Sequence, residues 1–213
     1  MIETWNIAGG VLKFEEETHT YWFNDKKCIS VTQILHKLFP EKYSGIDSEV
    51  LKKAANRGTE IHNAIEVYET LGLKRNELQE FRDYLFLKKY YKIEVLLVEL
   101  PIVIIYKDLV IAGRLDGILR EPIDEYTFRD CLYDIKTTSI LDKLYLSMQE
   151  SLYKYGYKQS YGDMALNIEG LRAFHLRKGT RKYVIVDPCD AEALLDKYIE
   201  ILEEEKNGKE SSN

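Results

Sequence analysis

The spacing of apolar residues changes abruptly near residue 93, and this change limits the folds that the chain can adopt. From about Asn76 to Tyr91 apolar residues recur at helical intervals. Three β-rich runs then follow one another, at Glu94–Ile105, Leu109–Arg120 and Phe128–Thr137. The polar turn Tyr106-Lys107-Asp108 between the first two runs predicts a hairpin. This order of elements is typical of the mixed α/β class.

Helices are predicted on both sides of these strands. Ser30 is a suitable N-cap for a helix over Val31–Leu38, and Gly72 is suited to end a helix over Asp47–Leu71. Short strands in the first thirty residues predict an N-terminal β extension. A further helix is predicted over Leu141–Ile168, and a break of it near Gly156 or Gly162 stays open as an alternative. The last predicted elements are a hairpin of Leu171–Leu176 and Tyr183–Val186 and a helix over Ala191–Glu205.

We therefore expect one α/β domain over residues 1–206, with a mixed central sheet flanked by helices. Within it, residues 1–45 form the N-terminal extension, 46–187 the core and 188–206 a closing helix. Residues 207–213 are expected to be a frayed tail.

Charge is unevenly distributed. The 213 residues include 30 Lys+Arg and 36 Asp+Glu, a net charge of −6. Residues 187–213 hold nine acids and three lysines, which account for all of that excess, so residues 1–186 are neutral overall. A protein that coats nucleic acid with a wholly basic surface is excluded, whereas a local basic cleft is not.

The remaining composition favours a reduced cytoplasmic setting without a membrane anchor. The three cysteines are widely spaced, which argues against a disulfide framework or a zinc knuckle. The first residues show no signal-peptide pattern. The longest apolar stretch, Val95–Tyr106, is interrupted by Glu99 and Pro101 and is too short to span a bilayer.

Two acidic residues stand in predicted strands. Asp134 and Lys136 lie on the same face of one strand, since side chains alternate along it. Asp116 interrupts an otherwise apolar strand between Gly113 and Gly117, and strand glycines often mark a close approach. The alternatives are a surface ion pair of Asp134 with Lys136, and a salt bridge from Asp116 to Arg114 or a turn cap.

A third group lies on the long helix, where Thr59, His62, Glu66 and Glu69 share one stripe. The alternative is a solvated helix face in which Glu66 caps His62. Together, a histidine, two aspartates and a lysine suit a divalent-metal phosphodiesterase site, because carboxylates favour Mg²⁺ or Mn²⁺ and a bound cation activates water.

These residues occur within four motifs: Gly58-Thr59-x-x-His62-x-x-x-Glu66, Ala112-Gly113-Arg114-x-Asp116-Gly117, Asp134-x-Lys136-Thr137-Thr138 and Gln149-x-x-x-Tyr153. In this order the chain resembles the RecB-like branch of the PD-(D/E)XK nuclease superfamily, from about Val31 to Leu176. The resemblance implies a restriction-endonuclease-like αβββαβ core. It also implies Mg²⁺ or Mn²⁺ as cofactor. Three scattered cysteines do not supply the four that hold an iron–sulfur cluster in some relatives, so we expect no cluster.

By this resemblance His62, Asp116, Asp134 and the main-chain carbonyl of Ile135 are metal ligands, and Lys136 is the catalytic lysine. Glu66 is expected to support His62. Gln149 and Tyr153 are expected to contact nucleic acid or to support Lys136.

Further nucleic-acid contacts are expected from Arg114 and from a basic hairpin that includes Arg177 and Lys178. The alternative for the hairpin is an ordinary solvated tip. A row of tyrosines at intervals of four on the helix near Gln149 offers base stacking or, alternatively, half-buried packing.

The resemblance implies a metal-dependent deoxyribonuclease, an exonuclease or end-processing enzyme in phage or mobile-element recombination or repair. Its expected partners are DNA with accessible ends, single- or double-stranded, and a recombination or replication protein. It is expected in the cytoplasm, that of the host if the chain is phage-encoded. Two alternatives stay open. One is a catalytically silent nuclease-fold module that binds DNA or a protein. The other is a carboxylate-pair hydrolase that uses Asp116 and Asp134 without Lys136.

Overall fold

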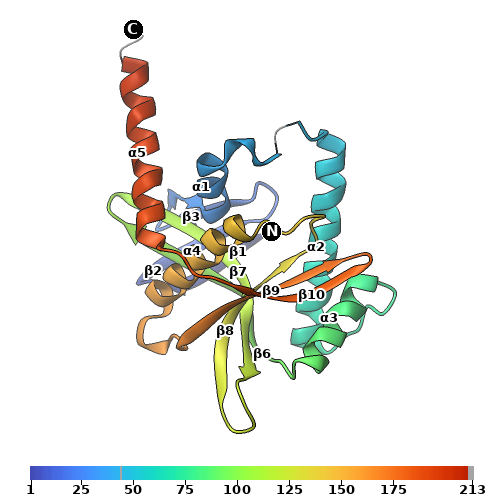
Figure 1. Cartoon of the computed structure of the whole chain (residues 1–213). Helices are drawn as coiled ribbons and strands as arrows, with labels where there is room; N and C mark the ends of the chain where they lie inside the picture. Colours follow the sequence, from blue (N-terminus) through green and yellow to red (C-terminus); the bar gives the residue numbers. More distant parts are fainter. Residues whose placement is uncertain (44, 211–213) are drawn as a thin grey trace.

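A six-stranded mixed sheet forms the centre of the molecule (Figure 1). The computed structural model describes residues 1–43 and 45–210. Along the sheet the order is β10-β9-β8-β7-β5, and β6 also pairs with β7. The β5/β7 and β8/β9 pairs are parallel and the others antiparallel. Its strands are β5 (Ile29–Ser30), β6 (Glu94–Tyr106), β7 (Leu109–Pro122), β8 (Phe128–Lys136), β9 (Ile168–Arg177) and β10 (Thr180–Val186).

Helices cover both faces of this sheet, which confirms the predicted α/β class. Helices α1 (Val31–Leu38), α4 (Lys143–Tyr161) and α5 (Ala191–Glu210) contribute to one apolar core. Helices α2 (Ser48–Leu71) and α3 (Gln79–Tyr90) contribute to a second core on the other face. Two short 3₁₀ turns, Pro40–Tyr43 and Gly162–Met164, follow α1 and α4. None of the helices in the described part of the chain is long and apolar enough to cross a membrane.

Local sequence signals explain where the helices that carry the site begin and end. The Ser30 side chain accepts a hydrogen bond from the Gln33 backbone N–H while Gln33 reciprocates, a capping box that starts α1. Asp47 caps α2, and Gly72 ends it in the left-handed conformation at φ 72°. The predicted bounds of both helices are confirmed to within one residue.

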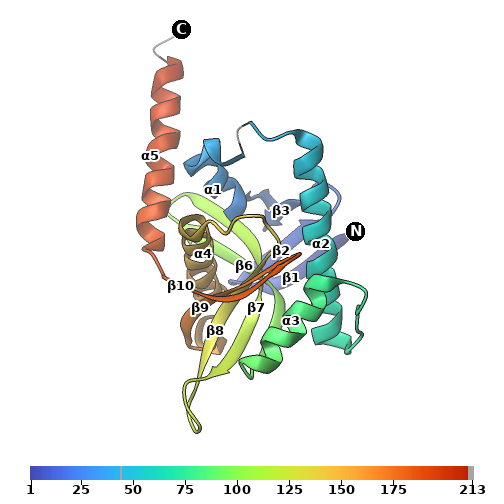
Figure 2. The same ribbon diagram turned by 45° about the vertical axis from the view of Figure 1, so that its right-hand side comes forward.

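The ends of other helices differ from the prediction. Helix α3 begins at Gln79 rather than Asn76. Helix α4 ends at Tyr161, at the break expected near Gly162, and does not reach Ile168. Helix α5 continues to Glu210, beyond the predicted end of the closing helix. It projects away from the rest of the molecule in both views (Figures 1 and 2). Of the predicted frayed tail, residues 211–213 lie outside the described residues.

The N-terminal extension is a four-stranded antiparallel sheet that packs onto the central one. It contains β1 (Ile2–Ile7), β2 (Gly10–Glu15), β3 (Thr20–Phe23) and β4 (Lys26–Lys27). Its buried residues, including Phe14 and Tyr21, form a third core with Val103 of β6 and Ala112 of β7. The predicted boundary at residue 45 is not a structural division, because β5 and α1 are part of the central sheet and its core.

Candidate metal centre

Three carboxylates lie in one row across three neighbouring strands. The register of β7 with β8 pairs Gly117 with Tyr133, which brings Asp116 opposite Asp134. The register of β6 with β7 pairs Val98 with Gly117 and Leu100 with Leu115, which brings Glu99 opposite Asp116. Directly opposed residues of antiparallel strands point to the same face and lie about 5 Å apart. The sheet therefore gathers acidic groups around Asp116.

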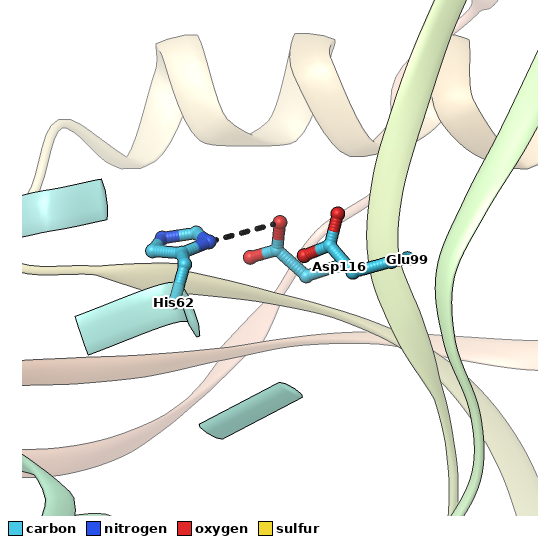
Figure 3. A group of neighbouring side chains, drawn as sticks. All are labelled: His62, Glu99 and Asp116. Atoms are coloured by element: carbon cyan, nitrogen blue, oxygen red, sulfur yellow. Dashed lines mark ion pairs between the residues drawn. The ribbon is translucent and has the colours of Figure 1, made fainter. Parts of the chain in front are cut away.

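His62 approaches this row from α2 (Figure 3). Its Nδ1 lies 3.4 Å from Asp116 Oδ1, and its Nε2 lies 2.9 Å from the backbone oxygen of Ile135, to which it donates. The other oxygen of Asp116 accepts a hydrogen bond of 2.6 Å from the Ile135 backbone N–H. The structure thus brings together His62, Asp116 and Ile135, three of the four predicted ligands.

The fourth predicted ligand, Asp134, lies beside them and holds the predicted catalytic lysine. Lys136 Nζ donates to Asp134 Oδ1 at 2.7 Å and to Gln149 Oε1 at 3.0 Å. Asp134 Oδ2 is buried and has no hydrogen-bond partner among the described residues. Since buried polar atoms are normally paired, an unpaired carboxylate oxygen here is consistent with a missing ligand.

The pKa values reflect this crowding of negative charge. Burial alone lowers the pKa of His62, but the Asp116 carboxylate reverses the effect and raises it to about 9. Burial, reinforced by the charge of Asp116, raises the pKa of Glu99 to about 7. Burial also raises the pKa of Asp134 to about 6, although the Lys136 ammonium opposes it. For Asp116 the His62 charge outweighs burial and lowers the pKa.

A divalent cation fits this donor set. One ligand atom from each of His62, Glu99 and Asp116 lies within 4.8 Å of the other two. Carboxylate oxygens and one imidazole nitrogen are suitable ligands for Mg²⁺ or Mn²⁺. The unpaired Oδ2 of Asp134 adds a further candidate ligand. Burial raises the pKa values of Glu99 and Asp134 most, the charge of Asp116 adds to both, and a cation would offset that charge.

The pocket in front of these groups has a volume of ≈ 520 Å³ and is closed partly by the N-terminal sheet. Phe14, His19 and Tyr21 line it opposite His62 and Asp116. The ring of Tyr153 reaches the pocket over Gly113, where a Cβ would meet that ring at 2.9 Å. Position 117 must also be glycine, because a Cβ there would lie 2.3 Å from the Leu97 backbone oxygen.

The sequence interpretation missed Glu99 and His19. Glu99 was taken only as a break in an apolar run. The predicted hairpin turn nevertheless fixes the register, and the two strands counted from it place Glu99 opposite Asp116. Glu99 also has a left-handed backbone at φ 50°, a strained conformation that is common at functional sites. No local signal could have placed His19, because its position depends on how the N-terminal sheet packs.

The structure shows the surroundings of three residues that were predicted to contact nucleic acid. Gln149 is buried and holds Lys136, so of its two expected roles only the support of Lys136 is observed. Tyr153 is buried too, although it lines the pocket. Arg114 is paired with Glu99 at 2.9 Å and with Glu3 at 3.2 Å, which neutralises its charge locally. The alternative of a salt bridge from Asp116 to Arg114 is not observed, because Asp116 contacts His62 instead.

Glu66 shares the pocket, but the expected support of His62 is wrong as a direct contact. Both ring nitrogens of His62 already face other groups, Asp116 and the Ile135 backbone oxygen. Arg177 donates to the Ser139 backbone oxygen at 3.1 Å from an exposed position. Lys178 is exposed at the turn between β9 and β10. Both remain candidates for contact with a polyanion.

Comparisons with known proteins add little to the geometry. No protein-family model matches the chain, and no curated protein matches it. A solved structure described as "Crystal structure of SSO0001" aligns with a TM-score of 0.46 and 15% sequence identity. The alignment covers 82% of this chain and 74% of that one.

Proposed function

We propose that the protein is a metal-dependent deoxyribonuclease that hydrolyses phosphodiester bonds at the His62 pocket. One observation carries the proposal: Glu99 and Asp116, which are partly exposed, form a row of carboxylates with the buried Asp134, with His62 at one side and Lys136 at the other. Carboxylates gathered so closely repel one another, and a cation held among them offsets that repulsion. Phosphodiester hydrolysis is the chemistry that such a centre with a lysine alongside suits best.

Each side chain has a role that follows from its contacts. His62, Glu99, Asp116 and Asp134 Oδ2 would hold the cation, which when bound neutralises a phosphate and lowers the pKa of coordinated water. Lys136 is fixed by Asp134 and Gln149, so its ammonium has a defined position. There it can orient the attacking water or stabilise charge that develops on phosphorus. Ile135 contributes its backbone N–H to orient Asp116.

The substrate we propose is DNA with accessible ends, as in recombination or repair. The N-terminal sheet closes one side of the pocket with Phe14, His19 and Tyr21. A pocket closed on that side favours the end of a DNA strand over the middle of a long duplex. Exonuclease or end-processing activity is therefore the proposed mode.

The direct test is cleavage of end-labelled linear DNA and of circular DNA of the same sequence, with Mg²⁺ or Mn²⁺ and with EDTA. We expect cleavage of linear DNA that needs the metal and stops with EDTA, and little cleavage of the circle. Absence of any metal-dependent product at high enzyme concentration contradicts the proposal and favours the silent DNA-binding module.

Lys136→Ala separates the proposal from a hydrolase that uses only a pair of carboxylates. Loss of the ammonium should lower the cleavage rate by about 10²–10³-fold, the range expected for a group that stabilises transition-state charge. The matched control is Lys143→Ala on α4, a lysine outside the pocket. Full activity of Lys136→Ala would contradict the assigned role.

A further inference from the structure

A row of exposed aromatic rings runs along α3 toward β10. Phe86, Tyr90 and Tyr91 are 45%, 69% and 40% exposed. The rings of Phe86 and Tyr90 are stacked, with centroids 5.9 Å apart and planes at 14°. The ring centroids of Tyr90 and Tyr91 are 5.0 Å apart, and those of Tyr91 and Tyr183 of β10 are 4.8 Å apart. Large rings exposed together in a continuous row are unusual unless they serve a binding surface. We call these four residues the aromatic platform.

Positive charge surrounds the aromatic platform. The guanidinium of Arg181 lies 3.8 Å from the centroid of the Phe86 ring. Residues 79–92 and 177–182 together contain eight Lys and Arg and two Asp and Glu, in a chain whose net charge is −6. Both of those acids, Glu80 and Asp83, are buried and paired with arginines. The exposed charge of this face is therefore basic, and it complements a polyanion.

The basic face is continuous with the end of the strand that carries the candidate metal centre. Strands β8 and β9 are paired so that Lys136 lies beside His175. His175 Nε2 lies 2.8 Å from the Thr138 backbone oxygen, and Arg177 donates a hydrogen bond to the Ser139 backbone oxygen. Both views show the β9–β10 hairpin beside α2 and α3 (Figures 1 and 2).

A groove lies between α2, the start of α3 and the turn between β9 and β10. It has a volume of ≈ 730 Å³, and it is lined by four basic residues, Arg57, Arg82, Lys178 and Arg181, and by the acids Glu80 and Asp83 that pair with Arg57 and Arg181. Arg57 directly precedes Gly58, which lines the metal pocket on α2. A polynucleotide chain that leaves the pocket beside Gly58, within α2, therefore meets Arg57 and the groove, which Gln79 and Arg82 of α3 also line.

We propose that the aromatic platform binds unpaired nucleotides of single-stranded DNA, with the surrounding Lys and Arg side chains contacting the phosphates. Stacking of bases on aromatic rings needs exposed base faces, which a duplex does not offer. The proposal rests on the proposed function, because it names the form of DNA that reaches the metal centre. A protein partner is disfavoured because the face is rich in lysine, which is depleted from protein interfaces.

The test is binding of fluorescently labelled oligo(dT), and of a duplex of equal length, measured by anisotropy in EDTA so that no cleavage occurs. Phe86→Ala and Tyr90→Ala should each weaken oligo(dT) binding by about 5- to 100-fold, the range for loss of one stacked base. Duplex binding should change by less than about twofold. The matched control is Tyr126→Ala, which removes an 82% exposed tyrosine from an acidic turn and should change neither affinity.

Three results would overturn the proposal. Unchanged oligo(dT) affinity in both variants contradicts stacking. An equal loss of duplex affinity indicates a general phosphate contact instead. A change of the sedimentation coefficient of the protein alone on Tyr90→Ala indicates that the aromatic platform contacts a second copy of the chain. Circular dichroism and thermal unfolding of each variant ensure that folded protein is compared.

Failure of this proposal can be distinguished from failure of the proposed function. Cleavage of DNA together with normal oligo(dT) binding by both variants refutes the aromatic platform alone. Binding that depends on Tyr90 without any metal-dependent cleavage by the unmodified protein supports the platform and refutes the nuclease.

Discussion

Neighbouring parts of the same strands carry two groups of charged side chains, and the two groups differ in how fully their carboxylate oxygens are paired. At the candidate metal centre Glu99, Asp116 and Asp134 face Arg114, His62 and Lys136, yet among the described residues one oxygen of Asp134 has no partner. The second group, which we call the Glu121 cluster, surrounds one carboxylate with several donors. They are Arg129 at 2.6 Å, Tyr183 at 2.6 Å and the buried Arg172.

The two groups differ in whether every carboxylate oxygen has a hydrogen-bond or ion-pair partner. At the Glu121 cluster, burial raises the pKa of Glu121, but hydrogen bonds from Arg172, Tyr183 and Arg129 outweigh it and lower the pKa overall. At the metal centre, burial raises the pKa values of Asp134 and Glu99, and one oxygen of Asp134 lacks a partner in the described residues. A satisfied cluster stabilises the fold, whereas an unsatisfied one is ready to bind a cation.

The largest expected effect is on activity. Asp134→Asn should lower cleavage by about 10³-fold, because it removes a charged cation ligand while its amide oxygen can still accept from Lys136. The free energy of unfolding should fall by no more than about 1 kcal/mol, since Oδ2 has no partner to lose. Initial cleavage rates and urea unfolding measure the two quantities.

Asp130→Asn is the control for that variant. Asp130 lies on the same strand but pairs with Arg120, away from the metal centre. It should keep full activity. Equal loss of activity in the two variants would show that the charge of β8, rather than the position of Asp134, matters.

At the Glu121 cluster the effect should be on stability. Glu121→Ala leaves the buried Arg172 without its carboxylate and should lower the free energy of unfolding by about 3–5 kcal/mol. The cleavage rate per folded molecule should stay unchanged. Arg120→Ala, which breaks the ion pair of the 41% exposed Arg120 with Asp130, should cost about 1 kcal/mol or less. If both substitutions destabilise equally, the Glu121 cluster is not the stabilising group that the contacts indicate.

Binding of a metal ion should stabilise the protein through the candidate metal centre and not through the Glu121 cluster. Mn²⁺ at about 100 times its dissociation constant should add about 2.7 kcal/mol to the stability of the unmodified protein, because it binds the folded state. Thermal unfolding with and without Mn²⁺ measures this shift. Asp116→Asn should lose most of it and Glu121→Gln should retain it. An equal Mn²⁺ shift in Asp116→Asn would place the cation elsewhere.

The fold was largely predictable because its signals are local. Capping by Ser30, the left-handed Gly72 and the change of apolar period lie within a few residues of what they determine. Within the predicted N-terminal β extension, β1 was not identified as a separate strand. Its residues alternate only between exposed and half-buried positions, so pairing with β2 determines it. The end of α5 was missed because residues 203–207 are exposed and polar, which gives no apolar period to follow.

Site residues that belong to a sequence motif could be predicted. Contacts that depend on how distant segments pack together could not. His62, Asp116, Asp134 and Lys136 were identified from their motifs, and the structure gathers them at one end of the sheet. Arg114 was expected to face a phosphate, and the only partner that the neighbouring sequence suggested for it was Asp116. Its partners Glu3 and Glu99 are 111 and 15 positions away, so only tertiary structure reveals them.

The smallest expected effect concerns Glu150, a fully buried acid on α4 whose oxygens lack hydrogen-bond partners in the part of the chain that the structure describes. Burial raises its pKa well above the usual value, so the folded state keeps a proton that the unfolded chain loses near pH 4.3. Above that pH, stability falls as pH rises toward the folded pKa. Glu150→Gln does not titrate and should therefore be more stable than the unmodified protein by about 1–2 kcal/mol at pH 8, and no more stable at pH 4. Urea unfolding at both pH values measures the difference, with the exposed Glu200→Gln as control. If Glu150→Gln raises the free energy of unfolding equally at the two pH values, its effect comes from packing and not from loss of a titrating group. Glu150 would then not differ from the hydrogen-bonded Glu121 through its protonation.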